Sequence, residues 1–171
     1  MEDLGGPLLI IFGGLPGAGK TTVARQLARQ IGAVHVRIDT IEQALVASGL
    51  INGPVNDAGY RVGHAVAEDN LRLGRIVIAD SVNPLAISRD AWRAVAERAG
   101  GRALEVEFVC TNREEHRRRV ETRTSDIADL RLPAWSDVQA REYEPWNRSH
   151  LVIDTGVTTV EESAALVLRA I

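Results

Sequence analysis

One stretch near the start of the chain, residues 14–21, has the residue types and spacing of a loop that binds phosphate. It reads GLPGAGKT and matches the pattern G-x-x-x-x-G-K-[ST]. Its glycines let successive backbone N–H groups face an anion, and the helix expected to follow adds its N-terminus to the same point. Lys20 can reach the β- and γ-phosphates, and the Thr21 hydroxyl can coordinate Mg²⁺. The loop therefore predicts binding of ATP with Mg²⁺.

Lys20 stands out in the composition as well as in the motif. The chain has 20 basic residues, of which Lys20 is the only lysine. Arginine is bulkier and planar, so it does not replace lysine at such a loop. A glycine-rich turn that only joins a strand to a helix is the alternative interpretation. We expect the nucleotide to contact the loop and the residue after it, namely Gly14, Pro16, Gly17, Ala18, Gly19, Lys20, Thr21 and Thr22.

Around this loop, short apolar runs alternate with stretches of helical spacing. The predicted strands span residues 7–12, 33–38, 75–79, 103–110 and 151–153. The predicted helices span residues 21–31, 40–48, 58–73, 86–99, 112–123 and 160–171. Strands separated by helices form βαβ units with right-handed crossovers, which predicts an α/β fold with a parallel sheet. Only residues 124–149 depart from this alternation of strands and helices. We predict a single domain over residues 1–171.

Three carboxylates follow predicted strands, where ligands bind in open α/β sheets. Asp80 comes after an apolar run and is predicted to hold Mg²⁺, with a simple turn before Asn83 as the alternative. Asp154 is expected to belong to a helix cap, with a secondary role near the nucleotide base.

Asp39 has two interpretations that can both hold. Residues 39–42 read DTIE, which is a capping box for the next helix and explains the aspartate without a function. A carboxylate at this strand end could also accept the proton of an acceptor hydroxyl. We therefore treat Asp39 as a candidate catalytic and acceptor-binding residue.

Arginines crowd one predicted helix and its exit: Arg113, Arg117, Arg118, Arg119 and Arg123. Arg119 and Arg123 are four residues apart and share a face, from which they could stack on adenine and clamp the transferring phosphate. A solvated face of weak ion pairs is the alternative. Arg123 also opens the irregular segment, so we predict a lid over about residues 123–135, braced by Trp135 and Trp146.

The acceptor side has weaker candidates. Arg89 follows Asn83 and Pro84 along the chain and could meet a substrate anion. Arg61 and His64 share a helix face, although a surface or partly buried residue is the stronger interpretation for the histidine. With Asp39, the predicted acceptor contacts are Arg61, Asn83 and Arg89.

Composition excludes several other classes. The chain has 171 residues, 45% of them hydrophobic, and a net charge of −3, which argues against a dedicated nucleic-acid binder with its strong basic excess. The single cysteine, Cys110, permits no internal disulfide, and the apolar run over residues 8–12 is too short to cross a membrane. We expect a cytoplasmic protein.

Together these residues resemble the small P-loop kinases, a group that includes adenylylsulfate, gluconate and shikimate kinases, chloramphenicol phosphotransferase and the zeta-toxin-like kinases. The resemblance rests on residues 14–22, Asp39, Asp80 and the R-x-x-x-R at 119–123. It implies a nucleoside-kinase-like P-loop fold with strand order 2-3-1-4-5, helices on both faces and a small lid. It also implies that Asp39 binds or deprotonates the acceptor, that Arg119 lies by adenine, and that Arg123 reaches the phosphates.

The expected activity is ATP- and Mg²⁺-dependent transfer of the γ-phosphate to a hydroxyl of a small metabolite, sugar or antibiotic. Lys20, Asp39 and Arg123 are its predicted catalytic residues, and Thr21 with Asp80 its metal ligands. A kinase of nucleotides or nucleic-acid 5′ ends is one alternative, and a switch that hydrolyses ATP slowly is another. The arginine set that would bind an acceptor phosphate is not recognisable, so the acceptor stays open.

Overall fold

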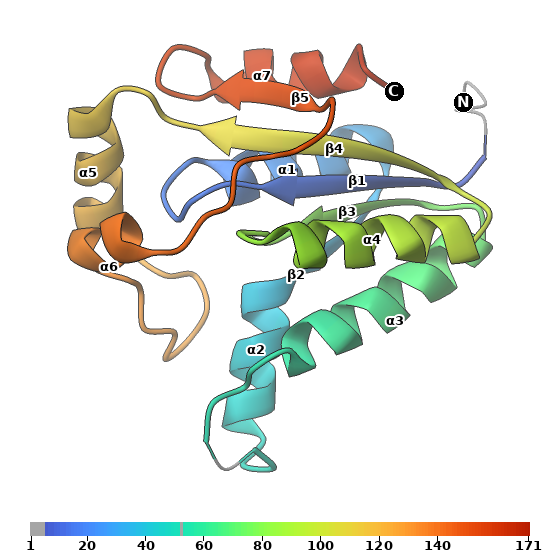
Figure 1. The fold of residues 1–171 in the computed structure, drawn as a ribbon, viewed down its shortest axis with the longest axis horizontal. Coiled ribbons are helices and arrows are strands. Elements are labelled where there is room, and N and C mark those ends of the chain that lie inside the picture. The colour runs from blue at the N-terminus through green and yellow to red at the C-terminus, as the bar shows by residue number, and fades with distance from the viewer. Residues whose placement is uncertain (1–5, 52) are drawn as a thin grey trace.

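The computed structural model describes residues 6–51 and 53–171 and shows a central sheet between two layers of helices (Figure 1). The strands are β1 (Leu8–Gly13), β2 (Val34–Arg37), β3 (Ile76–Asp80), β4 (Arg102–Val109) and β5 (Leu151–Asp154). All pairings are parallel and the order is β2-β3-β1-β4-β5. The predicted α/β class and strand order are confirmed.

The helices are α1 (Lys20–Ile31), α2 (Ile38–Ala47), α3 (Ala58–Arg72), α4 (Ala86–Arg98), α5 (Arg113–Thr122), α6 (Trp135–Ala140) and α7 (Val160–Leu168). Side chains of β1 alternate between the two layers because successive residues of a strand point to opposite faces. Ile10 packs with Leu27 of α1 on one face, and Ile11 packs with Trp92 of α4 on the other. Every residue of β1 is buried, as expected for the middle strand of a covered parallel sheet.

Two local features differ from the sequence-based prediction. Helix α6 forms inside the stretch that was expected to be irregular, and it anchors itself through Val138, which is 2% exposed. Helix α2 starts directly after β2, with Arg37 as its N-cap and no side-chain cap hydrogen bond. Asp39 therefore lies inside the first turn, and the capping-box interpretation of Asp39 is wrong.

The carboxyl ends of the strands point toward α5 and α6 (Figure 1). Between these helices, residues 123–134 form no regular helix or strand. Asp126 of this segment pairs with Arg25 of α1 and with Arg37, whose Nη1 lies 3.0 Å from both carboxylate oxygens. These ion pairs hold the segment against the carboxyl edge of the sheet.

Candidate functional site

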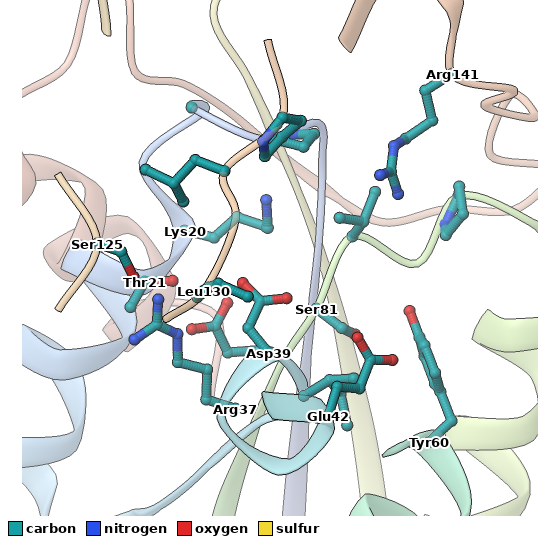
Figure 2. A pocket seen from close by; sticks show the side chains of 18 of the residues that line it. Lys20, Thr21, Arg37, Asp39, Glu42, Tyr60, Ser81, Ser125, Leu130 and Arg141 are labelled. Atoms are coloured by element: carbon teal, nitrogen blue, oxygen red, sulfur yellow. The ribbon is translucent and has the colours of Figure 1, made fainter. Parts of the chain in front are cut away.

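A cleft of about 1220 Å³ opens at the carboxyl edge of the sheet (Figure 2). It is lined by the phosphate-binding loop, the starts of α1, α2 and α3, the end of β3, and the segment after α5. The sequence-predicted residues that the structure brings together here are Pro16, Gly17, Gly19, Lys20, Thr21, Thr22, Asp39, Arg61, Asp80, Arg119 and Arg123. These residues come from five separate parts of the sequence and face one space.

The loop has the backbone that its glycines permit. Gly14, Gly17 and Gly19 have φ of 137°, 83° and 89°, values that L-residues rarely adopt. A Cβ on Gly14 would overlap the backbone carbonyl oxygen of Phe108 in β4, so the loop can sit this close to the sheet only with glycine there. Ala18 is buried, with 1% exposed, and supports the loop from within.

Lys20 lies at the floor of the cleft with 8% of its surface exposed. Its Nζ donates hydrogen bonds to the carbonyl oxygens of Gly14 (2.7 Å) and Leu15 (3.0 Å). Burial lowers the pKa of Lys20 to about 8, against the opposing charges of Asp80 and Asp39. The ammonium is therefore held inside the loop with two carboxylates facing it.

Asp80 is the last residue of β3 and is 3% exposed. Burial acts to raise the pKa of Asp80, but the contact with His35 and the charge of Lys20 together hold it below its usual value. His35 Nε2 lies 3.0 Å from Asp80 Oδ2, and the Thr21 hydroxyl also lowers this pKa. Asp80 is thus an ionised carboxylate beside Thr21, and His35 is a partner that the sequence did not reveal.

Asp39 projects into the cleft from the first turn of α2, between Lys20 and the residues of α3 (Figure 2). It makes no hydrogen bond or ion pair within residues 6–51 and 53–171. Its charge raises the pKa of Lys20 and that of Arg123, so both cations lie within its electrostatic reach. Asp39 is therefore an available carboxylate opposite the phosphate-binding loop.

The two arginines predicted for the nucleotide are differently placed. Arg123 is half-buried, and burial lowers its pKa. Arg119 donates to Glu115 Oε1 (2.7 Å), Thr155 Oγ1 (3.0 Å) and the Thr155 carbonyl (2.9 Å). Arg119 also lines a smaller adjoining cavity of about 240 Å³ with Gly19 and the β5–α7 loop. Its guanidinium plane therefore stands at the rim where the two spaces meet.

Two of the four predicted acceptor contacts do not reach the cleft. Arg89 has no exposed surface and donates to the carbonyls of Asn83 (3.3 Å), Glu144 (3.0 Å) and Pro145 (3.1 Å). Its guanidinium also lies 4.8 Å from the ring centroid of Trp146. Asn83 is equally buried, and its Nδ2 donates to a carbonyl of β1. Neither residue lines the cleft, because their donors hold loops together, so contact of Arg89 and Asn83 with an acceptor finds no support in this geometry and stays a prediction.

The two tryptophans also differ from each other. Trp146 lies under Arg89 and against Gly13 of β1, so it does not brace the predicted lid. Trp135 begins α6 and meets the ring of His116 edge-on, with 5.2 Å between centroids. Only Trp135 stands next to the segment that lines the cleft.

Other residues of the cleft were not singled out from the sequence. Glu42, Tyr60, Ser81 and Arg141 line its far side, and Arg141 reaches in from the end of α6 (Figure 2). Glu42 is three residues after Asp39 on the same helix face, which is a signal that helical spacing could have given. Arg141 and Ser81 lie far away in sequence and carried no such signal.

A family model described as an AAA domain matches residues 9–145. The chain belongs to this family of P-loop domains. No curated protein matches it in sequence. Within the described residues, no helix is both long and apolar enough to span a membrane.

Solved structures agree with the fold. The APS kinase of Mycobacterium tuberculosis in complex with AMPPNP and APS is 21% identical, with a TM-score of 0.71 over 96% of each chain. A putative kinase from Chloroflexus aurantiacus is 18% identical, with a TM-score of 0.73 over 96% of this chain and 98% of that one. A gluconokinase from Sinorhizobium meliloti is 18% identical, with a TM-score of 0.65 over 95% and 90%. The resemblance to small P-loop kinases is confirmed for family and fold.

Proposed function

We propose that this protein transfers the γ-phosphate of ATP to a hydroxyl group of a small molecule. One observation carries the proposal: an unpaired carboxylate, Asp39, faces Lys20 of the phosphate-binding loop across a single cleft. A site that only binds nucleotide needs the phosphate-binding loop but does not need a carboxylate on the opposite side of the cleft. The cleft of about 1220 Å³ exceeds the usual range for one small ligand, which is consistent with two substrates. The kinases among its structural neighbours support the same reading.

In the proposed reaction, this chain mainly positions and stabilises charge. Backbone N–H groups of the loop and Lys20 bind the β- and γ-phosphates. Arg123 approaches from the opposite side and balances charge on the transferring group. Asp39 accepts a hydrogen bond from the acceptor hydroxyl and aligns its oxygen with the γ-phosphorus. Arg119 lies beside the base at the rim of the smaller cavity.

The residues present also fit Mg²⁺. The described part of the chain has no cluster of three His, Cys, Asp or Glu side chains that could form a protein-only cage. Mg²⁺ in phosphoryl transfer needs only one or two protein oxygens because phosphates and water complete its shell. The Thr21 hydroxyl and the ionised Asp80 would hold it, with His35 fixing one Asp80 oxygen. When bound, the ion neutralises charge on the phosphates.

The test compares wild type with Asp39→Asn, using γ-labelled ATP and a panel of small hydroxylated compounds. We expect Asp39→Asn to lower transfer by roughly 10²- to 10⁴-fold, while the Kd for ATP changes little. Asp69→Asn is the matched control, since Asp69 is exposed on α3 and does not line the cleft. Wild-type transfer by Asp39→Asn would refute the role of the carboxylate. Nucleotide hydrolysis without any labelled product, unchanged in Asp39→Asn, would instead favour a regulatory switch.

A further inference from the structure

The far wall of the cleft has an unusual arrangement of charge. Asp39 and Glu42 lie one turn apart on the same face of α2, and both line the cleft. Neither carboxylate makes a hydrogen bond or ion pair within residues 6–51 and 53–171. Burial raises the pKa of Glu42, and the charge of Asp39 raises it further. Two neighbouring carboxylates that repel each other at the edge of a cavity are stabilised by a cationic partner.

Among the described residues, no arginine or lysine forms an ion pair with Glu42, although the charge of Arg141 reaches it. Arg61, the nearest arginine on α3, is 78% exposed and bound to Asp57 through Nε at 2.7 Å. The charge of Arg141 acts on Glu42 and on Lys20, so this arginine is shared between the two sides of the cleft. Glu42 and Asp39 both face the space of the cleft beside α3.

The residues around Glu42 suit the binding of an ammonium group better than the binding of an anion. Tyr60 lies beside it, close enough for the charge of Glu42 to raise the pKa of the phenol, which burial raises most. An aromatic ring next to carboxylates is a favourable setting for an alkylammonium group. The Ser81 hydroxyl lines the same space, is 6% exposed and lies near the Tyr60 hydroxyl, whose pKa it lowers, but it has no well-aligned hydrogen-bond partner among the described residues. Ser81 therefore offers a further buried acceptor for a ligand N–H or O–H.

The fold holds Glu42 in this position through a close approach of α2 and α3. Gly59, in the first turn of α3, is buried against the Glu42 side chain. A Cβ at this position would lie 2.9 Å from Glu42 Oε1 and 3.1 Å from its Cδ. The glycine therefore lets the Glu42 side chain pack directly against α3 at the edge of the cleft.

From this geometry we infer that the acceptor is an amino alcohol, whose hydroxyl meets Asp39 and whose ammonium group is bound by Glu42, Tyr60 and Ser81. The inference rests on the proposed phosphotransferase activity and names its substrate class. Sugars, polyols and amino sugars all carry suitable hydroxyls, so the ammonium group is the distinguishing feature. Glu42 is thus the specificity-determining residue, and Gly59 is a positioning residue that acts through it.

The experiment uses pairs of acceptors that differ only in an amine: 2-amino-1,3-propanediol with glycerol, and glucosamine with glucose. The assay is run at pH about 6.5, where both primary amines are largely protonated even though their neighbouring hydroxyls lower the amine pKa toward that of an α-amino group, about 8. Wild type should give a kcat/KM for the amine roughly 10- to 100-fold above that for its neutral partner. Glu42→Gln should remove this preference with less than about threefold effect on the neutral compound. Glu42→Asp should retain much of it, and Glu97→Gln, exposed on α4, should match wild type.

Gly59→Ala provides a second variant that keeps the carboxylate but displaces it. It should reduce the amine preference while leaving the Kd for ATP and the helical content unchanged. A merely structural role for Gly59 predicts instead an equal loss for amine and neutral acceptors. The same amines are also tested for direct binding by saturation-transfer NMR with ADP and Mg²⁺ present.

The ammonium site and the phosphotransferase activity are tested by different outcomes. Absence of Glu42-dependent amine binding, or equal kcat/KM within each pair, would overturn the amino-alcohol inference even if neutral acceptors are phosphorylated. Glu42-dependent binding without transfer of phosphate to any compound would uphold the ammonium site and overturn the phosphotransferase proposal.

Discussion

Gly14→Ala tests whether the phosphate-binding loop rests on the sheet as the structure shows. The residue has φ of 137°, which costs an L-residue roughly 1–3 kcal/mol. Its new Cβ would also overlap the carbonyl oxygen of Phe108, a buried residue of β4 that pairs with β5. Relief requires a shift of roughly 1 Å in backbone that is fixed on both sides, at a further cost of about 1–3 kcal/mol. We expect a total loss of roughly 2–6 kcal/mol.

The matched control is Gly32→Ala at the end of α1. Gly32 also has positive φ, at 65°, but a Cβ there would meet nothing within 4 Å. Only the left-handed conformation is penalised, so we expect a loss of about 1–2 kcal/mol. The difference between the two variants isolates the contact with Phe108.

Urea unfolding gives the free energy of unfolding of each variant, and a fluorescent ATP analogue gives its Kd. Gly14→Ala should lower the urea midpoint much more than Gly32→Ala, because a domain of this size has only about 5–15 kcal/mol in total. It should also weaken nucleotide binding, which Gly32→Ala should leave intact. If both variants lose the same stability with equal m-values, the close approach of the loop to β4 is refuted.

Two further predictions concern the cleft. Lys20 is the only lysine and has a pKa of about 8, so a reagent that modifies side-chain amines should react with it at that pH. ATP with Mg²⁺ should protect Lys20 from the reagent. Equal modification with and without ATP would contradict contact between Lys20 and the nucleotide. Asp126→Asn should cost about 1 kcal/mol or less, because its ion pairs with Arg25 and Arg37 are partly exposed, and should speed hydrogen exchange over residues 123–134. The pKa of Asp126 is about 2 against an ordinary 3.8, so its contribution is fully present above 3.8 and lost as pH falls through 2. A difference from Asp126→Asn that persists below pH 2 would refute the pairing.

Much of the fold could be predicted because its signals are repeated along the chain. Apolar strands such as β1 alternate with helices whose apolar residues recur at helical spacing, and the observed bounds lie within a few residues of those predicted. Helix α6 escaped prediction because six residues carry too little periodicity, and it depends on the burial of Val138. Its existence is a consequence of tertiary packing.

The start of α2 shows how a correct local signal can mislead. The DTIE sequence has the pattern of a capping box, but β2 runs into α2 without a turn and the helix begins at Ile38. A strand that leads directly into a helix leaves no turn residue to mark the junction. The cap is therefore not formed, and Asp39 is left with its carboxylate directed into the cleft. The competing structural explanation for this residue disappears with the cap.

Arg89 shows a feature of the structure for which the sequence contains no local signal. An arginine after a strand end is a reasonable ligand for an anion, and nothing near it in the sequence suggests burial. Its partners are carbonyls at positions 83, 144 and 145, which only the folded chain brings together. Convergence of carbonyl groups depends on backbone position rather than residue type, so it leaves no pattern in the sequence.

The two halves of the cleft differ in how much of each could be predicted from the sequence. The nucleotide half is encoded by eight consecutive residues, because a phosphate is bound mainly by the backbone of one loop and one lysine. The other half is assembled from Glu42 on α2, Tyr60 on α3 and Ser81 after β3, which meet because β2 and β3 are neighbours in the sheet. A local motif can therefore identify the phosphate donor while leaving the acceptor undetermined. It also follows that substitutions at Glu42 and at Lys20 should affect acceptor choice and ATP affinity independently, since the two residues belong to separate walls of one cleft.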